Sequence, residues 1–200
     1  PSGGWTLQSQ AAGQILVGSD QGRVTFAGSG DTTIVAYGQG NVISAAKGDH
    51  AIATGTGNAR VTLLDGNNQI FGGGTGDIIV GGNGNSIVMG QTGNTRITLG
   101  NGNQSIGLSG AGNVISVGTG MSVISAGTGG NESVTVAGGT NQISVGGTNN
   151  FVRMLGGTNL ISASGSQSRF QLDAGSNTLY AAGSGNTITG GNGNSKIWGS

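Results

Sequence analysis

A β-branched or large apolar residue recurs at every ninth position along most of the chain. The spacing is unbroken from Ile43 to Ile124, shifts by one extra residue in the stretch TGGNES, and continues from Val134 to Ile197. Upstream, the series extends with one further shift as far as Ile15. A repeat this regular predicts an array of similar short units, each stacked on its neighbour.

Each unit is predicted to be one short strand. Nine is not a helical period, and the 46 glycines would strongly destabilise a helix. Ile115 and Val117 are separated by Ser116, and residues two apart share one face of a strand. At one unit, either Ile87 or Val88 can fill the buried position. The residues expected in the core are Ile43, Val61, Ile70, Ile79, Ile97, Ile106, Ile115, Ile124, Val134, Ile143, Ile161, Leu179 and Ile188.

Neighbouring units differ in the position of their asparagine. It lies three residues before the apolar position at Asn131 and two residues before it at Asn141, so units eighteen residues apart are alike. Two strands per coil, stacked in parallel, would pair the backbone and enclose one narrow core. The sequence therefore predicts an all-β, flattened two-sheet parallel β-solenoid over residues 15–200, with about eighteen residues per coil and roughly ten coils. Residues 1–14 are expected to be an N-terminal lead-in or coupling segment, and the solenoid can be one piece of a longer array.

Asparagines recur in the turns between the predicted strands. An asparagine side chain can hydrogen-bond the backbone nearby, tolerates a left-handed conformation and can bond its equivalent in the next coil. We expect these residues to stabilise turns and to form ladders along the rod. They are Asn58, Asn68, Asn94, Asn103, Asn113, Asn131, Asn141, Asn159, Asn177 and Asn186.

The stretches GGNGNSIVM, GTGDIIV and GAGNVISVG each carry turn glycines before an apolar position. From about residue 15 to 200, this pattern resembles the hemolysin-type (RTX) calcium-binding β-roll repeats of secreted bacterial proteins. The resemblance implies a bacterial, secreted or cell-surface protein in an extracellular setting. The family motif, G-G-x-G-x-D-x-U-x, places an aspartate two residues before the apolar position, and its carboxylate binds calcium between coils.

The chain departs from that motif at the aspartate. Only Asp77 occupies the motif position, while Asp31 and Asp49 lie one residue earlier. Elsewhere the position holds residues such as Asn68, Asn113, Asn141, Asn186 and Ser122. Because calcium favours several oxygen ligands with carboxylates among them, we expect the rod to fold without a cofactor or metal. Asp77 is the remaining calcium candidate.

The composition argues against several classes of function. The formal net charge is zero and the seven basic residues are scattered, which disfavours nucleic-acid binding. No apolar run approaches the roughly 20 residues needed to span a bilayer. The only histidine, His50, lies beside Asp49, and we expect it in a solvated turn rather than in a catalytic site. With its acidic residues scattered singly, the chain offers no paired carboxylates, and we expect no enzyme activity.

The outward positions of alternate units vary in size. The series from Val35 to Trp198 is small in the middle and bulky toward both ends. On the opposite face, arginine alternates with apolar residues from Arg23 to Val114, a pattern that fits either charge spacing on a solvated face or lateral contact with another rod. The candidate residues for self-association or ligand binding are Trp5, Phe71, Met89, Tyr180 and Trp198.

These features favour a secreted structural protein whose subunits stack head to tail into an extracellular fibre, biofilm matrix or surface layer. The partner is then a second copy of the chain, since an uncapped solenoid end presents unpaired backbone groups. One alternative is an adhesin stalk or carbohydrate-binding module of a large surface protein, with extracellular polysaccharide bound on Tyr180 and Trp198. A second alternative is an ice-binding protein, although the outward positions show no clean threonine plane.

Overall fold

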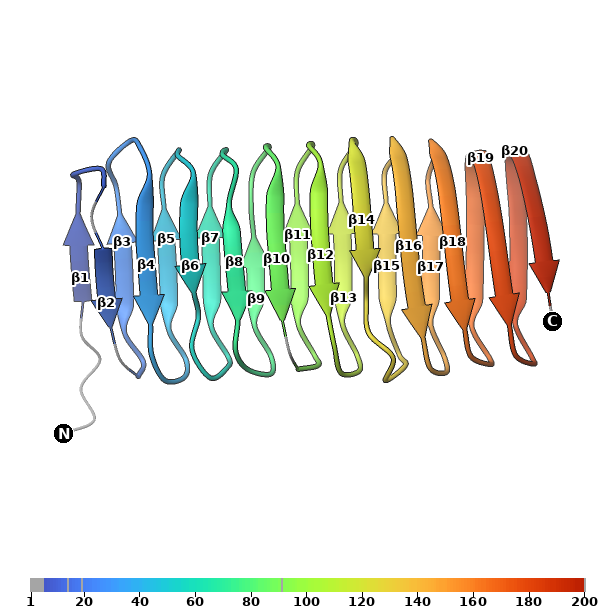
Figure 1. The fold of residues 1–200 in the computed structure, drawn as a ribbon, viewed down its shortest axis with the longest axis horizontal. Coiled ribbons are helices and arrows are strands. Elements are labelled where there is room, and N and C mark those ends of the chain that lie inside the picture. Colours follow the sequence, from blue (N-terminus) through green and yellow to red (C-terminus); the bar gives the residue numbers. More distant parts are fainter. Residues whose placement is uncertain (1–5, 14, 19, 91, 200) are drawn as a thin grey trace.

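The computed structural model describes residues 6–13, 15–18, 20–90 and 92–199, and these form a straight parallel β-solenoid (Figure 1). The described residues contain no helix, so none of them forms a membrane-spanning helix. About ten coils of about eighteen residues stack along the rod, which confirms the predicted fold class. The strands are β1 (Thr6–Ser9), β2 (Ile15–Gly18), β3 (Arg23–Phe26), β4 (Thr32–Ala36), β5 (Val42–Ala45), β6 (His50–Ala53), β7 (Arg60–Leu63), β8 (Gln69–Gly72), β9 (Ile78–Val80), β10 (Ser86–Gly90), β11 (Arg96–Leu99), β12 (Gln104–Leu108), β13 (Val114–Val117), β14 (Met121–Ser125), β15 (Ser133–Val136), β16 (Thr140–Gly146), β17 (Phe151–Met154), β18 (Thr158–Ser164), β19 (Arg169–Ala182) and β20 (Thr187–Gly199).

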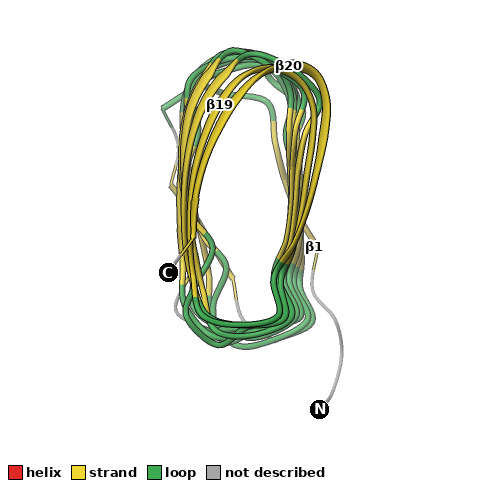
Figure 2. Cartoon of the chain, turned by 90° about the vertical axis from the view of Figure 1, so that its right-hand side faces the viewer, coloured by secondary structure: helices red, strands yellow, loops and turns green. Residues whose placement is uncertain are grey.

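The coil is a flattened ring with two long sides, as the view along the rod shows (Figure 2). Each strand from β1 to β17 pairs in parallel with the strand two places further along the chain, for example β11 with β13 and β12 with β14. The long strands β19 and β20 each cover both sides of a coil and pair with each other. We call the odd-numbered side, β1 to β17 with residues 169–172 and 187–190, the arginine face. The even-numbered side, β2 to β18 with residues 176–182 and 194–199, is called the apolar face.

The parallel pairing includes β1, which pairs with β3. This strand lies inside the 1–14 segment assigned to a lead-in, so stacking begins before residue 15. The extra residue of TGGNES is absorbed between β14 and β15, because Ile115 still aligns with Val134 on the arginine face. The nine-residue register therefore survives an insertion when the insertion falls in a corner.

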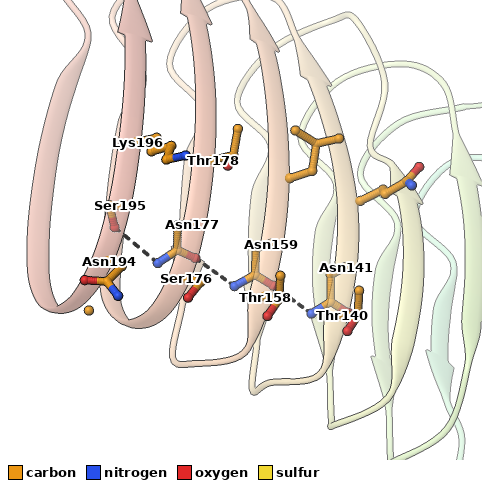
Figure 3. A pocket seen from close by; sticks show the side chains of 13 residues that line it. Thr140, Asn141, Thr158, Asn159, Ser176, Asn177, Thr178, Asn194, Ser195 and Lys196 are labelled. Carbon is orange, nitrogen blue, oxygen red and sulfur yellow. Dashed lines mark hydrogen bonds between the residues drawn. The ribbon is translucent and has the colours of Figure 1, made fainter.

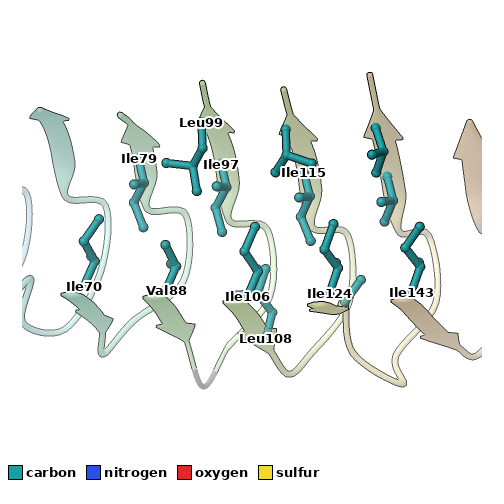
Figure 4. Close-up of a cluster of buried hydrophobic side chains, with 14 of the residues drawn as sticks. Ile70, Ile79, Val88, Ile97, Leu99, Ile106, Leu108, Ile115, Ile124 and Ile143 are labelled. Atoms are coloured by element: carbon teal, nitrogen blue, oxygen red, sulfur yellow. The ribbon is translucent and has the colours of Figure 1, made fainter. Parts of the chain in front are cut away.

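The interior is a column of aliphatic side chains from both faces (Figure 4). Twelve of the thirteen residues expected in the core are at most 2% exposed, and Ile188, in the last coil, is partly buried against the others. At the ambiguous unit, Val88 points inward at 1% exposure and Ile87 outward at 40%. Stacking removes these side chains from water on every side, which is the main favourable contribution to folding such a rod.

The two corners of the coil have different backbone conformations, which explains the two kinds of repeat. Before the arginine face, the residue three places ahead of the core position is left-handed in every coil from residue 21 to residue 185, and it can be asparagine, as at Asn58 with φ 52°. Before the apolar face, φ is larger, as at Gly102 with φ 135°, a conformation that is essentially restricted to glycine. A Cβ at Gly102 would also collide with the carbonyl oxygen of Gly84 in the coil below. A left-handed asparagine can therefore recur at the first corner, whereas the positive-φ position of the second corner holds glycine.

Candidate functional site on the apolar face

The two faces carry different side chains on their outer surfaces. The arginines all point outward from the arginine face, at Arg23, Arg60, Arg96, Arg153 and Arg169. Among the described residues, Arg153 alone of these five forms an ion pair, with Asp173 at 2.7 Å. On the apolar face, by contrast, the outward strand residues from Thr33 to Thr178 carry no charge.

Two rows of side chains run along the apolar face. The central row, in register order, is Val35, Ala53, Phe71, Met89, Gly107, Ser125, Ser144, Ser162, Tyr180 and Trp198. The side row, two residues earlier in each strand, is Thr33, Ala51, Gln69, Ile87, Ser105, Val123, Gln142, Leu160, Thr178 and Lys196.

The bulky members of the central row form two clusters. Tyr180 and Trp198 stack with ring centroids 4.9 Å apart and planes 14° apart, and both are nearly half exposed. Phe71 and Met89 are neighbours in register and are each 49% exposed. Trp5, the fifth candidate, lies outside the described residues. The structure thus brings four of the five candidate surface residues into one row, in two pairs.

A shallow groove of about 940 Å³ runs beside this row across the last four coils (Figure 3). One wall is formed by Thr140, Thr158, Ser176 and Asn194, and the other by Gln142, Leu160, Thr178 and Lys196. A smaller groove of about 450 Å³ occupies the equivalent place on earlier coils, from Asn67 to Val123. Hydroxyl and amide groups line the first groove beside an exposed aromatic stack, an arrangement that suits a polar, ring-containing ligand.

The floor of the groove contains a buried asparagine ladder. Asn141 donates its side-chain N–H to the Oδ1 of Asn159 at 2.8 Å, and Asn159 donates in turn to Asn177 at 2.7 Å. The ladder ends on the Ser195 hydroxyl, at 3.4 Å from Asn177. Asn68 holds the same position lower on this face, where its Oδ1 accepts the backbone N–H of His50 at 3.2 Å.

A second buried ladder runs inside the arginine face. There, a side-chain oxygen of one coil accepts a backbone N–H of the coil before it, as in Asn113 to Thr95 at 3.1 Å. Asn186 accepts the N–H of Ser168 in the same way, at 2.9 Å. Because an unpaired buried donor is costly, these side chains fix the register of each coil on the next.

The remaining expected ladder residues lie at the corners. Asn58, Asn94 and Asn131 occupy the left-handed corner with φ between 52° and 58° and are exposed. Asn103 belongs to an exposed corner row, where it accepts the N–H of Met121 at 2.9 Å and donates its own N–H to Asn85 at 2.8 Å. The asparagines therefore serve three structural roles.

Two carboxylates belong to the buried ladder of the arginine face. Asp77 accepts the backbone N–H of Ala59 at 2.9 Å and the hydroxyl of Thr54 at 3.0 Å, while burial raises the pKa of its carboxyl. Burial raises the pKa of Glu132 to about 7, although its Oε2 accepts the N–H of Asn113 at 2.9 Å. The structure thus makes Asp77, the calcium candidate, an acceptor for protein donors. Within the described ranges, no three acidic, histidine or cysteine side chains gather in a metal-binding group.

The expectation of a solvated turn for His50 is wrong. His50 opens β6 and is only 2% exposed, with its Nε2 2.9 Å from the carbonyl oxygen of Ala46. Its ring lies edge-on to Phe26, with centroids 5.7 Å apart. The position is the inner ladder position of its coil, so Asp49, one residue earlier, is the residue that points to solvent.

Sequence reasoning also missed two surface features. The groove was not foreseen, because its walls depend on how each corner meets the strand that follows. The arginine face carries a second outward row of mostly hydroxyl side chains, namely Thr25, Ser44, Thr62, Val80, Thr98, Ser116 and Thr135. The nine-residue period alone could have revealed that row, because each member directly follows a core position.

Comparison with known proteins gives one partial match. A family model described as a protein of unknown function (DUF3060) matches residues 145–200, which correspond to the last coils and to most of the groove. Neither the search of curated proteins nor the search of solved structures gives a match. The resemblance to hemolysin-type repeats therefore stays an expectation.

Proposed function

We propose that the chain is a structural rod that extends when a second copy stacks on its β20 end, in a secreted bacterial fibre, matrix or surface layer. The parallel stacking of similar coils, which continues as far as β20, is the observation that supports this proposal. On one side, β20 pairs with β19 along nearly its whole length, from Thr187 to Gly199. Among the described residues, no strand pairs along its other side. The function proposed is mechanical and needs neither catalysis nor a cofactor.

The outer edge of β20 is suited to pairing with another strand. The strand contains no proline and a single charged residue, Lys196. Edges that avoid association usually carry several charges, a proline or a bulge, and an exposed regular edge acts as a template for another strand. Stacking of further coils would continue both the sheet and the core.

The inner ladders could also continue across such a contact. In most coils the ladder side chain of the arginine face accepts a backbone N–H of the coil before it, as Asn186 does from Ser168. A following coil with asparagine, serine or a carboxylate at the same position would do the same for the last coil. Extension by a coil of the same kind therefore needs no new type of interaction.

The proposal is tested with a matched pair of variants at Gly190. Thr187 donates its N–H to Ser168 at 2.8 Å, so strand alternation places the N–H of Gly190 on the outer edge. A Cβ at Gly190 would meet no atom within 4 Å. We expect Gly190→Pro to abolish concentration-dependent fibres in negative-stain images while Gly190→Ala keeps them, with unchanged circular dichroism in both. Dispersed parent particles at high concentration would refute axial stacking.

A second candidate function is carbohydrate binding, as part of an adhesin stalk or binding module. The stacked Tyr180 and Trp198 rings beside the groove are the observation that favours it. Sugar rings pack on exposed aromatic faces, while hydroxyl and amide side chains supply hydrogen bonds. A glycan-array or pull-down comparison should show binding lost in Trp198→Ala and retained in Phe71→Ala. Equal binding by both variants would exclude this site.

A further inference from the structure

Along the central row of the apolar face, bulky and small side chains occur in blocks that each span several coils. Phe71 and Met89 project from adjacent coils, and the next four positions are Gly107, Ser125, Ser144 and Ser162. Two protruding side chains are therefore followed by a smooth stretch of comparable or greater length. A surface with a projection and a depression at matched distances from one point can be complementary to itself under two-fold rotation.

That point is Gly107. We propose that two copies of the rod pair through their apolar faces, with coil order reversed and the two-fold axis passing through the Ser105–Gly107 segment of β12. In this register Phe71 lies over Ser144 of the partner subunit, and Met89 lies over Ser125 of the partner subunit. Gly107 meets its own equivalent on the axis, so no two bulky side chains oppose each other in the central row from Ala53 to Ser162.

The side row independently supports the same register. Counting the same number of coils from Ser105 pairs Ile87 with Val123 of the partner subunit, and both are apolar and at least 40% exposed. One coil further out, Gln69 is opposite Gln142 of the partner subunit, where two amides can hydrogen-bond to each other. A shift by one coil would place Ile87 opposite Gln142 or Ser105 of the partner subunit instead, depending on its direction.

Charge selects the apolar face over the arginine face. Four exposed arginines, Arg23, Arg60, Arg96 and Arg169, form no ion pair within the described residues, so two arginine faces would repel each other. The apolar face has no charge between Thr33 and Thr178 and collects most of the exposed large apolar side chains. Exposed large apolar side chains gathered on one uncharged face favour an association site there.

The available area is adequate for a stable contact. With coils about 4.8 Å apart and residues about 3.3 Å apart along each strand, the paired rows cover about 600 Å² on each copy. Both copies together then bury about 1,200 Å², the lower end of the range for specific stable interfaces. The straight stacking of the coils allows both faces to stay in contact along the rod (Figure 1).

The first test is a pair of arginine substitutions in a Gly190→Pro background, which removes axial stacking. We expect this background chain to sediment as a dimer, with twice the 19.3 kDa monomer mass. Gly107→Arg should raise the dissociation constant about 100-fold or more, because it places two like charges on the axis. The fold tolerates this change, since a Cβ at Gly107 would meet only the Cε of Met89, at 3.9 Å. The control Thr98→Arg adds the same charge to the arginine face and should leave the dimer intact.

The second test addresses the register. The double variant Q69E/Q142E should weaken the dimer, because two carboxylates face each other twice across the axis, whereas Q69K/Q142E should restore or strengthen it. Equal weakening by both double variants would overturn the proposal. A Gly190→Pro chain that stays monomeric at its highest soluble concentration would also overturn it, even if that chain bound a glycan. If the Gly107→Arg chain without the Gly190→Pro change still forms fibres, axial stacking persists when the face-to-face dimer is lost.

Discussion

The arginine face and the apolar face are built from the same nine-residue unit, yet they resemble each other only on the inside. Inward, both present columns of apolar side chains and one polar ladder, as at Ile97 and Asn113 on the arginine face and at Ile106 and Asn141 on the apolar face. Outward, one carries all five arginines and the other is uncharged over most of its length. Stacking therefore constrains the interior of every coil equally and leaves the exterior free to diverge, so function is to be sought in the outward rows.

The largest expected effect tests whether the interior is the same on both faces. Ile97→Ala on the arginine face and Ile106→Ala on the apolar face should each lower the free energy of unfolding by about 2–5 kcal/mol, through lost burial and a new cavity. Urea unfolding followed by circular dichroism measures both. A loss at one face more than twice that at the other would show that the two interiors are not equivalent.

The next effect distinguishes the two faces by how stability depends on pH. Among the described residues, only the arginine face has carboxylates in its buried ladder. Burial raises the pKa of Glu132 from 4.5 to about 7, so the folded chain binds a proton that the unfolded chain releases. Stability from this group is complete below pH 4.5 and is lost as pH rises to about 7, by an amount on the order of 3 kcal/mol.

Thermal unfolding across that pH range measures the effect. The melting temperature of the parent should fall as pH rises, and Glu132→Gln should flatten the profile. The matched variant on the apolar face, Gln104→Ala, should lower the melting temperature without flattening it. A parent whose stability rises steadily over the same range would contradict the assignment to Glu132.

A smaller effect distinguishes the corners that lead into the two faces. Gly102→Asn, at φ 135° before the apolar face, should destabilise the chain by about 2 kcal/mol, because the conformation is strained for any side chain. Gly76→Asn, at φ 76° before the arginine face, should cost under about 0.5 kcal/mol, since Asn58 and Asn94 hold the equivalent corner in adjacent coils. Denaturant midpoints of the two variants give the comparison, and equal losses would mean that the corners are interchangeable.

The smallest effect concerns the ion pair on the outer surface of the arginine face. The guanidinium of Arg153 lies 2.7 Å from Asp173, and hydrogen bonds from Gln171 and Arg153 lower the pKa of that carboxyl. Arg153→Gln should cost under about 1 kcal/mol, and the difference should shrink at high salt, because both side chains are partly exposed. An undiminished difference in concentrated salt would point instead to lost packing.

Much of the fold could be predicted because stacking imposes one period on every coil. The nine-residue spacing gives the alignment of Ile115 with Val134 across the insertion. It leaves Ile87 and Val88 open as the inward residue of their unit, and the structure selects Val88. The alternating asparagine gives two kinds of corner, one left-handed and one restricted to glycine. The period also places His50 inward, two residues before Ile52, but the Gly-Asp-His stretch has the composition of a turn and therefore favours the wrong expectation.

The candidate site was predictable only in outline. The row from Phe71 to Trp198 follows from the period, but the close stacking of Tyr180 and Trp198 depends on side-chain rotation, which the period does not determine. The groove between Thr158 and Leu160 depends on the curvature of the backbone where corner and strand meet. Features that repeat were readable from the sequence, whereas features that arise from local shape were not.

The direction of the hydrogen bonds in the ladders gives the rod a built-in order of assembly. Inside the arginine face, the oxygen that satisfies a coil comes from the coil after it, as Asn113 does for Thr95. At the exposed corner the oxygen comes from the coil before, as Asn85 does for Asn103. An added coil therefore supplies hydrogen-bond acceptors to the coil before it inside the arginine face. At the exposed corner, it donates its own N–H groups to that same coil. When coils are added one after another, polar groups are left without a partner only in the last coil added.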